Sequence, residues 1–360
     1  MNSSAFAKAS ADKAAFAKSP TRQSRSGDGA ASADRRAHPG LHRWAVATAA
    51  ATLLLITAGG LVTSTESGLS VPDWPTTYGS NMFTFPVSRW VGGIRFEHSH
   101  RLIASAVGLM TVVLAVWLQR REQRRWVRRL GWAALAAVVA QGLLGGLTVI
   151  FLLPTSVSVA HACLAQTFFC LSVALAIVTS PGFQAGETAP RSPVSRAAAL
   201  TTALVFGQLF VGAVMRHTKA GLAIPDFPLA LGRIFPPIES SAVAIHFGHR
   251  VGAVLVACGV AACVLQAVRS CRPRLVKTAW LLAALVVAQI ALGALTVLSG
   301  KQFLLTTAHV VTGALLLGAS LTLWIFSRKG GSSTSLSPRE RAGVRGELSE
   351  GVFPEAVAWK

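Results

Sequence analysis

The sequence EHSHR, which begins at Glu97, places a carboxylate and an imidazole where they could act together. Glu97 and His100 are three residues apart, so on a helix they lie on one face, and Arg101 follows directly. The apolar run that comes next is typical of a membrane-spanning helix, and ionisable groups at the edge of hydrocarbon are functional candidates. A carboxylate there could relay a proton, act as a base toward water or bind an intermediate. The alternative is a surface carboxylate that pairs with Arg95 or Arg101.

An internal repeat selects four of the nine histidines. Four segments recur in the same order roughly 150 residues later. They are SGLSVPDWP at 67–75 with AGLAIPDFP at 220–228, the segments around His100–Arg101 and His249–Arg250, QGLLGGLTV at 141–149 with QIALGALTV at 289–297, and the segments around His161 and His309. The histidines at 38, 42, 98, 217 and 246 have no histidine counterpart. The repeat therefore retains one histidine pair in each half of the chain.

Two imidazoles at matched depth in an apolar helical bundle are the usual axial ligands of six-coordinate haem iron. No cluster of carboxylates or thiolates accompanies either pair in the sequence, as a zinc or di-iron site would require. The sequence therefore predicts one haem-iron site at His100 and His161 and a second at His249 and His309. For a lone intramembrane histidine, hydrogen bonding between helices is the alternative.

Arg101 and Arg250 directly follow one histidine of each pair. Each guanidinium could hold a haem propionate by a bidentate, charge-assisted contact, and the alternative is that the side chain extends toward the membrane surface. The repeated GL–PD–P loops would lie over the outer mouth of each half, where Asp73 and Asp226 could line it. A repeated turn needs only its Pro and Gly residues, so a haem contact of the two aspartates stays open.

Membrane-spanning helices must position these residues. The chain has 360 residues, of which 52% are hydrophobic and 13% charged, and its mean hydropathy is +0.52. A soluble domain of this size could not bury so much apolar surface. In lipid every backbone polar group must be bonded within its own segment, so apolar runs of about 20 residues predict helices. We expect eight, at about 44–64, 100–118, 130–152, 157–179, 197–216, 242–267, 278–298 and 302–326.

The net charge of +20 is distributed according to the topology of these helices. If the helices alternate in direction, most of the 34 Lys and Arg residues fall on one side of the membrane, including the run RREQRRWVRR at 120–129. This positive-inside pattern places both termini in the cytoplasm and favours contact with anionic lipid over nucleic-acid binding. We therefore expect a multi-pass protein of the bacterial cell (inner) membrane. The mitochondrial inner membrane is the alternative, because the basic N-terminal tail resembles a transit peptide in composition.

The repeat also sets the domain organisation. We expect a disordered basic N-terminal tail at 1–43, an N-terminal four-helix half at 44–180, a cytoplasmic linker at 181–196, a C-terminal four-helix half at 197–327 and a disordered C-terminal tail at 328–360. Four crossings return the chain to its starting side, so the halves are parallel repeats. The predicted fold is an all-α integral membrane protein, with eight transmembrane helices in two parallel-repeated four-helix bundles.

The halves differ at one position beside the histidines. Glu97 stands three residues before His100, whereas His246 stands three before His249. One predicted site thus has a carboxylate on the face of its ligand, and the other has an imidazole. A non-enzymatic dihaem b-type cytochrome that transfers electrons from quinol would explain the four ligands but would leave this difference without a role. A transporter built from parallel repeats is a third reading, but it would need helices broken within the membrane.

The doubled four-helix plan, EHSHR matched to HFGHR, the two later histidines and the loop SGLSVPDWP together resemble the haem A synthase family. The resemblance covers residues 44–326, and it is specific as a combination although each motif alone is not. It implies an oxidoreductase acting on a CH3 group: the C8 methyl group of haem O is oxidised through the alcohol to the formyl group of haem A. Water is the implied oxygen source, and the product serves cytochrome oxidase biogenesis.

The same resemblance implies roles for the site residues. The C-terminal half would hold a haem b prosthetic group (iron protoporphyrin IX) between His249 and His309. The N-terminal half would be the substrate site, with His100 and His161 at the iron of haem O and Glu97 as the catalytic carboxylate. Implied partners besides haem O and lipid are a haem O synthase, cytochrome oxidase assembly proteins and a second copy of the chain. Some bacterial members carry a cysteine pair in an outer loop, and the corresponding loops here have none.

Overall fold

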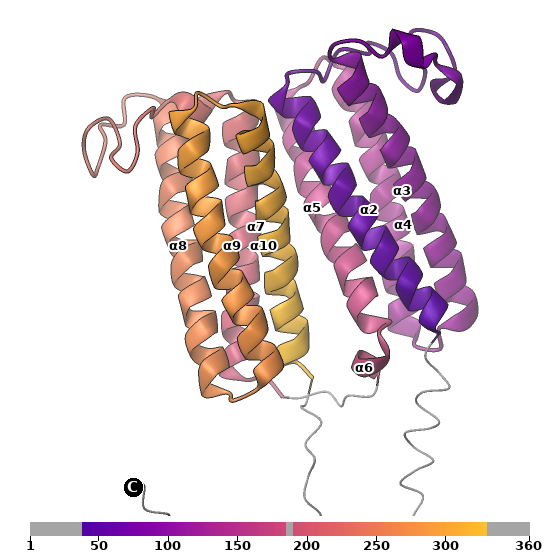
Figure 1. Ribbon diagram of the computed structural model, residues 1–360, viewed down its shortest axis with the longest axis vertical. Helices are drawn as coiled ribbons and strands as arrows, with labels where there is room; N and C mark the ends of the chain where they lie inside the picture. The colour runs from indigo at the N-terminus through magenta and orange to yellow at the C-terminus, as the bar shows by residue number, and fades with distance from the viewer. Residues whose placement is uncertain (1–37, 185–189, 330–360) are drawn as a thin grey trace, which may run out of the picture. The chain divides into compact units, whose positions relative to one another are not determined.

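The computed structural model describes residues 38–184 and 190–329, and the regular secondary structure within these ranges is helical (Figure 1). Eight of the helices are long and apolar enough to cross a membrane, which confirms the expected fold class. They are α2 Pro39–Ser64, α3 Ile94–Arg121, α4 Arg125–Ile150, α5 Thr155–Val178, α7 Pro193–His217, α8 Ser241–Arg269, α9 Pro273–Leu298 and α10 Phe303–Ser327. The short elements are α6 Pro181–Gln184 and the 3-10 turns Met82–Thr84, Val87–Arg89 and Ala220–Leu222.

Most of the long helices extend beyond the apolar runs that predicted them. α3 begins at Ile94 and ends at Arg121, so Glu97 lies in its first turn and two arginines lie in its last. Hydropathy marks only the part of a helix that faces hydrocarbon, whereas the backbone hydrogen bonds continue into the charged ends. Proline in the first turn starts α2, α7 and α9, where its missing N–H has no intrahelical partner to lose.

Two expected domain boundaries need correction. α2 begins at Pro39, so residues 39–43, which we assigned to the disordered tail, are helical. The expected linker 181–196 contains α6 and the first residues of α7. The rest of the N-terminal tail and the C-terminal tail from residue 330 lie outside the described residues.

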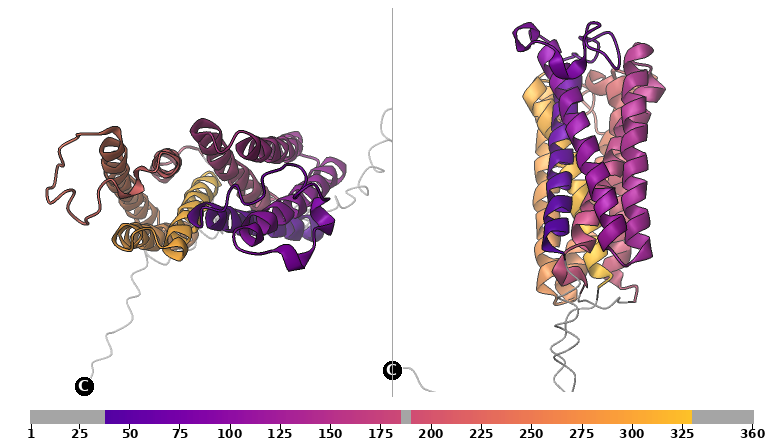
Figure 2. Two further views of the ribbon diagram at one scale, coloured as in Figure 1. Left: turned by 90° about the horizontal axis from the view of Figure 1, so that it is seen from above. Right: turned by 90° about the vertical axis from the view of Figure 1, so that its right-hand side faces the viewer.

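The long helices form two groups, the N-terminal half (α2–α5) and the C-terminal half (α7–α10). In the N-terminal half α2 packs on α3, α3 on α4, α4 on α5 and α5 on α2, which closes a ring (Figures 1 and 2). α7–α10 pack in the same order, and α10 also contacts α2 and α5 of the other half. That the halves are copies of one unit stays an interpretation of the sequence, and the matched contacts described below support it.

Close packing holds each half together. Buried apolar side chains fill the interior of each ring, among them Leu114 and Leu118 in the N-terminal half and Leu282 and Leu317 in the C-terminal half. Lipid tails are as apolar as these side chains, so tight packing rather than escape from water favours helix association. Gly131 of α4 shows how tight it is: a Cβ there would lie 2.7 Å from Leu118, so only glycine lets the two helices approach this closely.

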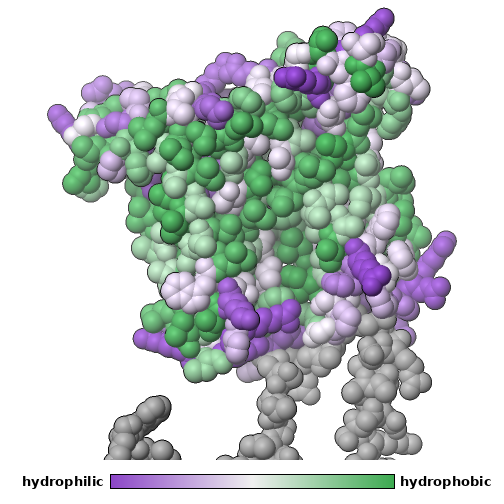
Figure 3. Space-filling view, viewed as in Figure 1, coloured by the Kyte–Doolittle hydropathy of each residue, from purple (hydrophilic) through white to green (hydrophobic). Residues whose placement is uncertain are grey.

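Hydrophilic side chains gather at the two ends of the helices, with an apolar band between them (Figure 3). One end carries the connections 65–93, 151–154, 218–240 and 299–302, and we call it the loop end. The four repeat-related histidines lie on α3, α5, α8 and α10, the helices that begin at the loop end. Each lies within roughly the first two helical turns, so all four are at similar depth below the loops.

Candidate functional site

The first long loop is folded around the Asp73 carboxylate. Asp73 Oδ1 accepts the Tyr78 N–H at 2.7 Å and Oδ2 accepts the Gly79 N–H at 2.9 Å, while the Thr76 hydroxyl also donates to Oδ2. Gly79 has φ of +71°, a left-handed conformation that glycine adopts without strain. Burial of the Asp73 carboxyl acts to raise its pKa, but the hydrogen bonds from Thr76, Gly79 and Tyr78 outweigh burial and hold the pKa below its ordinary value.

The second long loop repeats this turn at equivalent positions. Asp226 accepts the N–H groups of Leu231 and Gly232, both at 2.8 Å, and Gly232 has φ of +73°. The Gly232 and Leu231 N–H groups lower the pKa of Asp226 below its ordinary value. Asp73 and Asp226 thus have a structural role in their turns, and a contact of either with haem stays a prediction.

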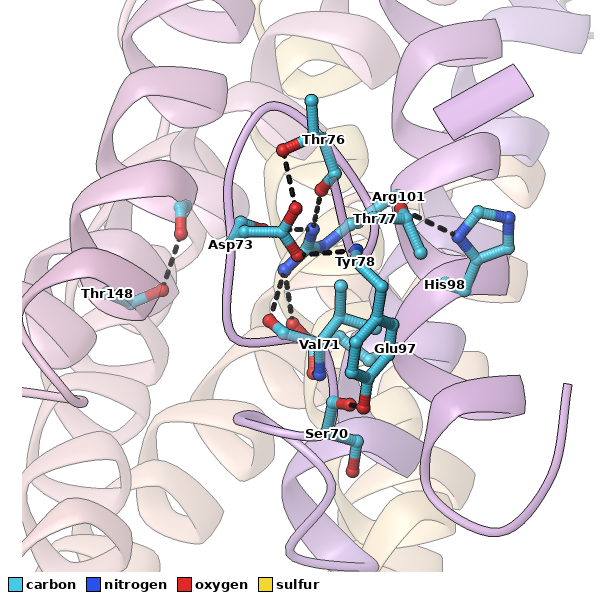
Figure 4. A network of polar contacts seen from close by, with 11 residues as sticks. Ser70, Val71, Asp73, Thr76, Thr77, Tyr78, Glu97, His98, Arg101 and Thr148 are labelled. Carbon is cyan, nitrogen blue, oxygen red and sulfur yellow. Dashed lines mark hydrogen bonds and ion pairs between the residues drawn. The ribbon is translucent and has the colours of Figure 1, made fainter. Parts of the chain in front are cut away.

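Arg101 binds the first loop to α3, with its guanidinium enclosed by Val71, Asp73 and Thr76 of the loop (Figure 4). Its Nη1 donates to the carbonyl oxygens of Asp73 at 2.7 Å and Thr76 at 3.0 Å, and its Nη2 donates to that of Val71 at 2.9 Å. Nη2 also donates to Glu97 Oε1 at 2.6 Å, an ion pair between residues one helical turn apart. Arg101 is 9% exposed, so this network is shielded from water.

Arg250 makes the same three contacts in the C-terminal half. Nη1 donates to the Leu229 carbonyl at 2.8 Å, and Nη2 donates to those of Ile224 at 3.1 Å and Asp226 at 2.6 Å. The arginine that follows each repeated histidine therefore fastens a loop in this structure. The predicted contact of Arg101 or Arg250 with a propionate stays a prediction, because most donors of each guanidinium bind the loop or Glu97.

Glu97 is buried between α3 and the first loop, with 4% of its surface exposed. Oε2 accepts the Val71 N–H at 2.8 Å, and Oε1 accepts from Arg101. The pairing with Arg101 that we considered is thus present, but in a buried site and not on the surface. A carboxylate has about four acceptor positions, so its oxygens can accept hydrogen bonds beyond these two.

His246 takes the place of Glu97 in the C-terminal half. Its Nδ1 accepts the Ile224 N–H at 3.2 Å, and the side chain is 3% exposed. His98, by contrast, is fully buried under the first loop, where Thr77 Oγ1 lies 3.2 Å from its Nδ1 and the Phe85 and Trp90 rings pack against it. His98 thus packs under the loop, and we had not predicted that role.

Each predicted iron ligand packs the edge of its imidazole against a glycine of the preceding helix. A Cβ at any of these glycines would lie 3.0 to 3.2 Å from the Cε1 atom of the ring, tighter than ordinary van der Waals contact. The four pairs, which we call glycine seats, are Gly59 with His100, Gly145 with His161, Gly212 with His249 and Gly293 with His309. Sequence reasoning missed these glycines, although two of them recur in the repeated segments QGLLGGLTV and QIALGALTV.

In two of the seats, a glutamine one helical turn before the glycine donates a side-chain hydrogen bond to the histidine residue. Gln141 Nε2 donates to the backbone carbonyl of His161 at 3.0 Å, and Gln208 Nε2 donates to that of His249 at 2.7 Å. Gln208 Nε2 also lies 3.0 Å from His249 Nδ1. These bonds hold the ligand residue to the helix that carries its seat.

The other two seats differ from each other. His309 Nδ1 donates to the Gln289 backbone carbonyl at 3.1 Å. The ring proton is then on Nδ1, and Nε2 of His309 has the free lone pair that could bind iron. The side-chain nitrogen of Gln289 lies 3.3 Å from this Nε2 atom. At the seat of His100 the corresponding residue is Leu55, which has no carboxamide. His100 is thus the one ligand candidate whose seat offers no glutamine.

The geometry of the C-terminal pair fits a single metal atom. The His249 and His309 rings meet edge-on, with centroids 6.4 Å apart and ring planes inclined at 66°. Two imidazoles on opposite sides of one metal, each with its nitrogen about 2 Å from it, have centroids separated by roughly 6 Å. In the N-terminal half His100 and His161 each pack against a glycine of the preceding helix, as His249 and His309 do. The donor set in each half, two imidazoles in an apolar bundle, therefore fits haem iron.

Trp74 of the first loop reaches over the N-terminal half. A Cβ at Gly146 of α4 would lie 2.6 Å from the Trp74 ring, so the indole rests directly on the helix backbone. Gly146 is next to Gly145, the seat of His161. The loop thus covers α4 beside one predicted ligand.

Comparison with known proteins shows which family this chain matches. The family described as "Cytochrome oxidase assembly protein" matches residues 42–91 and 93–321. A "Heme A synthase" of Halalkalibacterium halodurans is 29% identical over 291 residues, covering 78% of this chain and 94% of the relative. A protein of the same name from Alkalihalophilus pseudofirmus is 32% identical over 224 residues, covering 59% and 72%. Another from Shouchella clausii is 30% identical over 275 residues, covering 73% and 88%.

Proposed function

Because the chain belongs to the haem A synthase family of cytochrome oxidase assembly proteins, we propose that it oxidises the C8 methyl group of haem O to the formyl group of haem A. In the first step CH3 and water give CH2OH with loss of two protons and two electrons. In the second step CH2OH gives CHO with loss of two more of each. An external electron acceptor must take up the electrons.

We assign haem O to the N-terminal half and haem b to the C-terminal half. His100 and His161 would bind the iron of the substrate, and their glycine seats would fix the orientation of the two rings. His249 and His309 would hold haem b, which supplies one-electron redox chemistry when bound. The alternative, a dihaem cytochrome that only transfers electrons, is not favoured by the names of the relatives.

The observation that carries this assignment is the difference between Glu97 and His246. The two side chains occupy equivalent positions and accept the equivalent backbone N–H, yet only the N-terminal half has a carboxylate there. Glu97 lies one turn from His100 and is buried, so a proton released by water near the substrate has an acceptor in a site that excludes bulk solvent. The bond from Arg101 keeps this carboxylate in place.

Expression with a haem O source, followed by extraction of the haems, tests the proposal. We expect haem A and the intermediate alcohol in extracts of cells that make the protein, and only haem O in cells that do not. Recovery of haem O alone, from a protein that carries bound haem, would contradict the enzymatic function. Two permanently bound haems that do not exchange with added haem O would instead indicate the cytochrome.

We further propose that the loop end faces away from the cytoplasm and that both termini are cytoplasmic, in a bacterial inner membrane. Most basic residues of the described chain lie at the end opposite the loop end, in its connections and the adjoining helix ends, and they include Arg124 and Arg272. Alkaline phosphatase fused within 218–240 should be active, and the same enzyme fused at the C-terminus should be inactive. The opposite result would reverse the orientation.

A further inference from the structure

Arg216 is a cation in the membrane-spanning part of the chain whose charge no described carboxylate balances. It lies in the last turn of α7, one turn beyond Gly212, the seat of His249. The described residues contain two carboxylate–arginine ion pairs, at Arg101 and at Arg124, and neither involves Arg216. The equivalent position in the N-terminal half is Thr63, so the charge belongs to the C-terminal half alone.

The guanidinium of Arg216 has donors to spare. Its two hydrogen bonds within the described chain go to Ser64 Oγ at 2.7 Å and to the Gly60 carbonyl at 3.3 Å, and both use Nη2. A guanidinium has five N–H donors in a planar fork. Arg101 and Arg250, by comparison, each use two nitrogens to bind three loop carbonyls. Of these three arginines, Arg216 has the most donors left for another acceptor.

The contacts of Arg216 place it beside a predicted haem ligand. Ser64, which accepts from Arg216, also accepts from Thr307 Oγ1 at 3.0 Å, and Thr307 is two residues before His309. The guanidinium is therefore linked through one serine to the helical turn that carries His309.

We propose that Arg216 binds a propionate carboxylate of the haem held by His249 and His309. The inference rests on the proposed function, because it takes the C-terminal half as the haem b site. A partly buried arginine in apolar surroundings requires an anion or several neutral acceptors, and the planar fork matches a carboxylate with two parallel bonds. Haem carries two propionates, and a ring bound by histidines near the loop end can direct one of them toward the end of α7. The propionate contact is thereby assigned to Arg216 in place of Arg250, whose donors fasten the second loop.

The test compares haem with its ester. Purified protein freed of haem is titrated with iron protoporphyrin IX and with its dimethyl ester, in which neither propionate can ionise. For the unmodified protein we expect esterification to weaken binding roughly 10- to 100-fold, the effect of losing a charge-assisted pair of hydrogen bonds. In Arg216→Met the two porphyrins should bind within about threefold of each other, because the carboxylate has lost its partner.

Two further variants make the test specific. Arg233→Met removes an exposed arginine from the second loop and should keep the full preference for the free acid. Arg216→Gln retains a donor toward Ser64 without the charge and should also lose the preference, so a folding defect in the methionine variant would not prevent a decision. Circular dichroism and gel filtration in detergent verify folding.

An equal penalty for the ester in the unmodified protein and in both Arg216 variants would overturn the inference alone. Failure of the unmodified protein to bind any haem through His249 and His309 would overturn the proposed function and this inference with it. The two failures are therefore distinguishable in one set of titrations.

Discussion

Glu97 and His246 accept a hydrogen bond from the same backbone position of their respective loops. Glu97 Oε2 receives the Val71 N–H at 2.8 Å, and His246 Nδ1 receives the Ile224 N–H at 3.2 Å. Both loops then bind the guanidinium of an arginine one turn further along the helix. The two halves therefore present one loop-and-helix geometry with a carboxylate in the first and an imidazole in the second.

The first prediction concerns the carboxylate itself. Glu97→Gln keeps an acceptor for the Val71 N–H but cannot take up a proton at neutral pH. We expect the variant to bind haem normally and to convert haem O about 10²- to 10⁴-fold more slowly, the usual contribution of a general base. Haem extraction after timed incubation gives the rate, and the visible spectrum gives the haem content. Glu239→Gln, which changes an exposed residue of the second loop, is the control. Unchanged conversion would exclude Glu97 as the base.

Much of the fold could be predicted from the sequence because it depends on local composition. Eight apolar runs indicated eight helices, and the internal repeat separated the four ligand candidates from the other histidines. Hydropathy could not locate helix ends such as Ile94, since charged residues keep helical hydrogen bonding outside the hydrocarbon. The inclusion of Glu97 in the first turn of α3 depends on that boundary.

The contacts of the candidate site could be predicted only in part. The pairing of Glu97 with Arg101 follows from their spacing along a helix, and we had considered it. The binding of loop carbonyls by Arg101 depends on how residues 71–76 fold back over α3, which no local pattern specifies. The glycine seats likewise require the position of a histidine ring relative to another helix. A repeated glycine was visible in the sequence, but the atom that it accommodates was not.

The second prediction tests a glycine seat with a neighbouring glycine as control. A Cβ at Gly145 would lie 3.2 Å from His161 Cε1, whereas a Cβ at Gly142 would meet nothing within 4 Å. We expect Gly145→Val to displace the imidazole and weaken binding of haem O by roughly 10- to 100-fold, the range for disturbed ligand orientation. Gly142→Val should bind haem O normally. Titration of the purified variants measures both affinities, and equal affinity would contradict the role of the seat.

The third prediction concerns the buried arginine below the first loop. Arg101→Lys retains the charge but replaces a planar fork with a single ammonium, which cannot reach three carbonyls and Glu97 together. We expect local stability of the loop to fall by about 3 kcal/mol, the lower range for disrupting a buried pair. Hydrogen exchange of residues 71–80 should accelerate accordingly. Arg95→Lys, at an exposed arginine of the same helix, should leave exchange unchanged.

The fourth prediction is the pH dependence of the first loop. The pKa of Asp73 in the folded protein lies below its ordinary value, so the carboxylate stabilises the turn above the unfolded pKa of about 3.9. That contribution is lost as pH falls through the lower, folded pKa. Exchange of the Tyr78 and Gly79 amides, corrected for the intrinsic rate, should therefore stay constant from about pH 7 to 5 and rise only below about pH 4. Asp73→Asn should abolish this rise in exchange rate. If the exchange rate already rises near neutral pH, a group other than Asp73 controls the stability of the loop.

The fifth prediction exchanges the residues that distinguish the His100 and His249 seats. Gln208 donates to the His249 carbonyl at 2.7 Å, and its counterpart at the seat of His100 is Leu55. Without that bond the His100 segment is held less firmly, which suits a site that must release its product. Gln208→Leu should therefore weaken haem b binding about tenfold, whereas Leu55→Gln should tighten haem O binding and slow its turnover.

Steady-state kinetics distinguish tighter binding of haem O from a general loss of folded enzyme. For Leu55→Gln we expect kcat and KM to fall together, because a more firmly held ligand binds substrate better and releases product more slowly. Leu54→Gln introduces the same carboxamide at an exposed position one residue away. That control should lose stability in the membrane without a lower KM. If Leu55→Gln raised KM, or if both variants behaved alike, the absence of a glutamine at the His100 seat would have no part in substrate exchange.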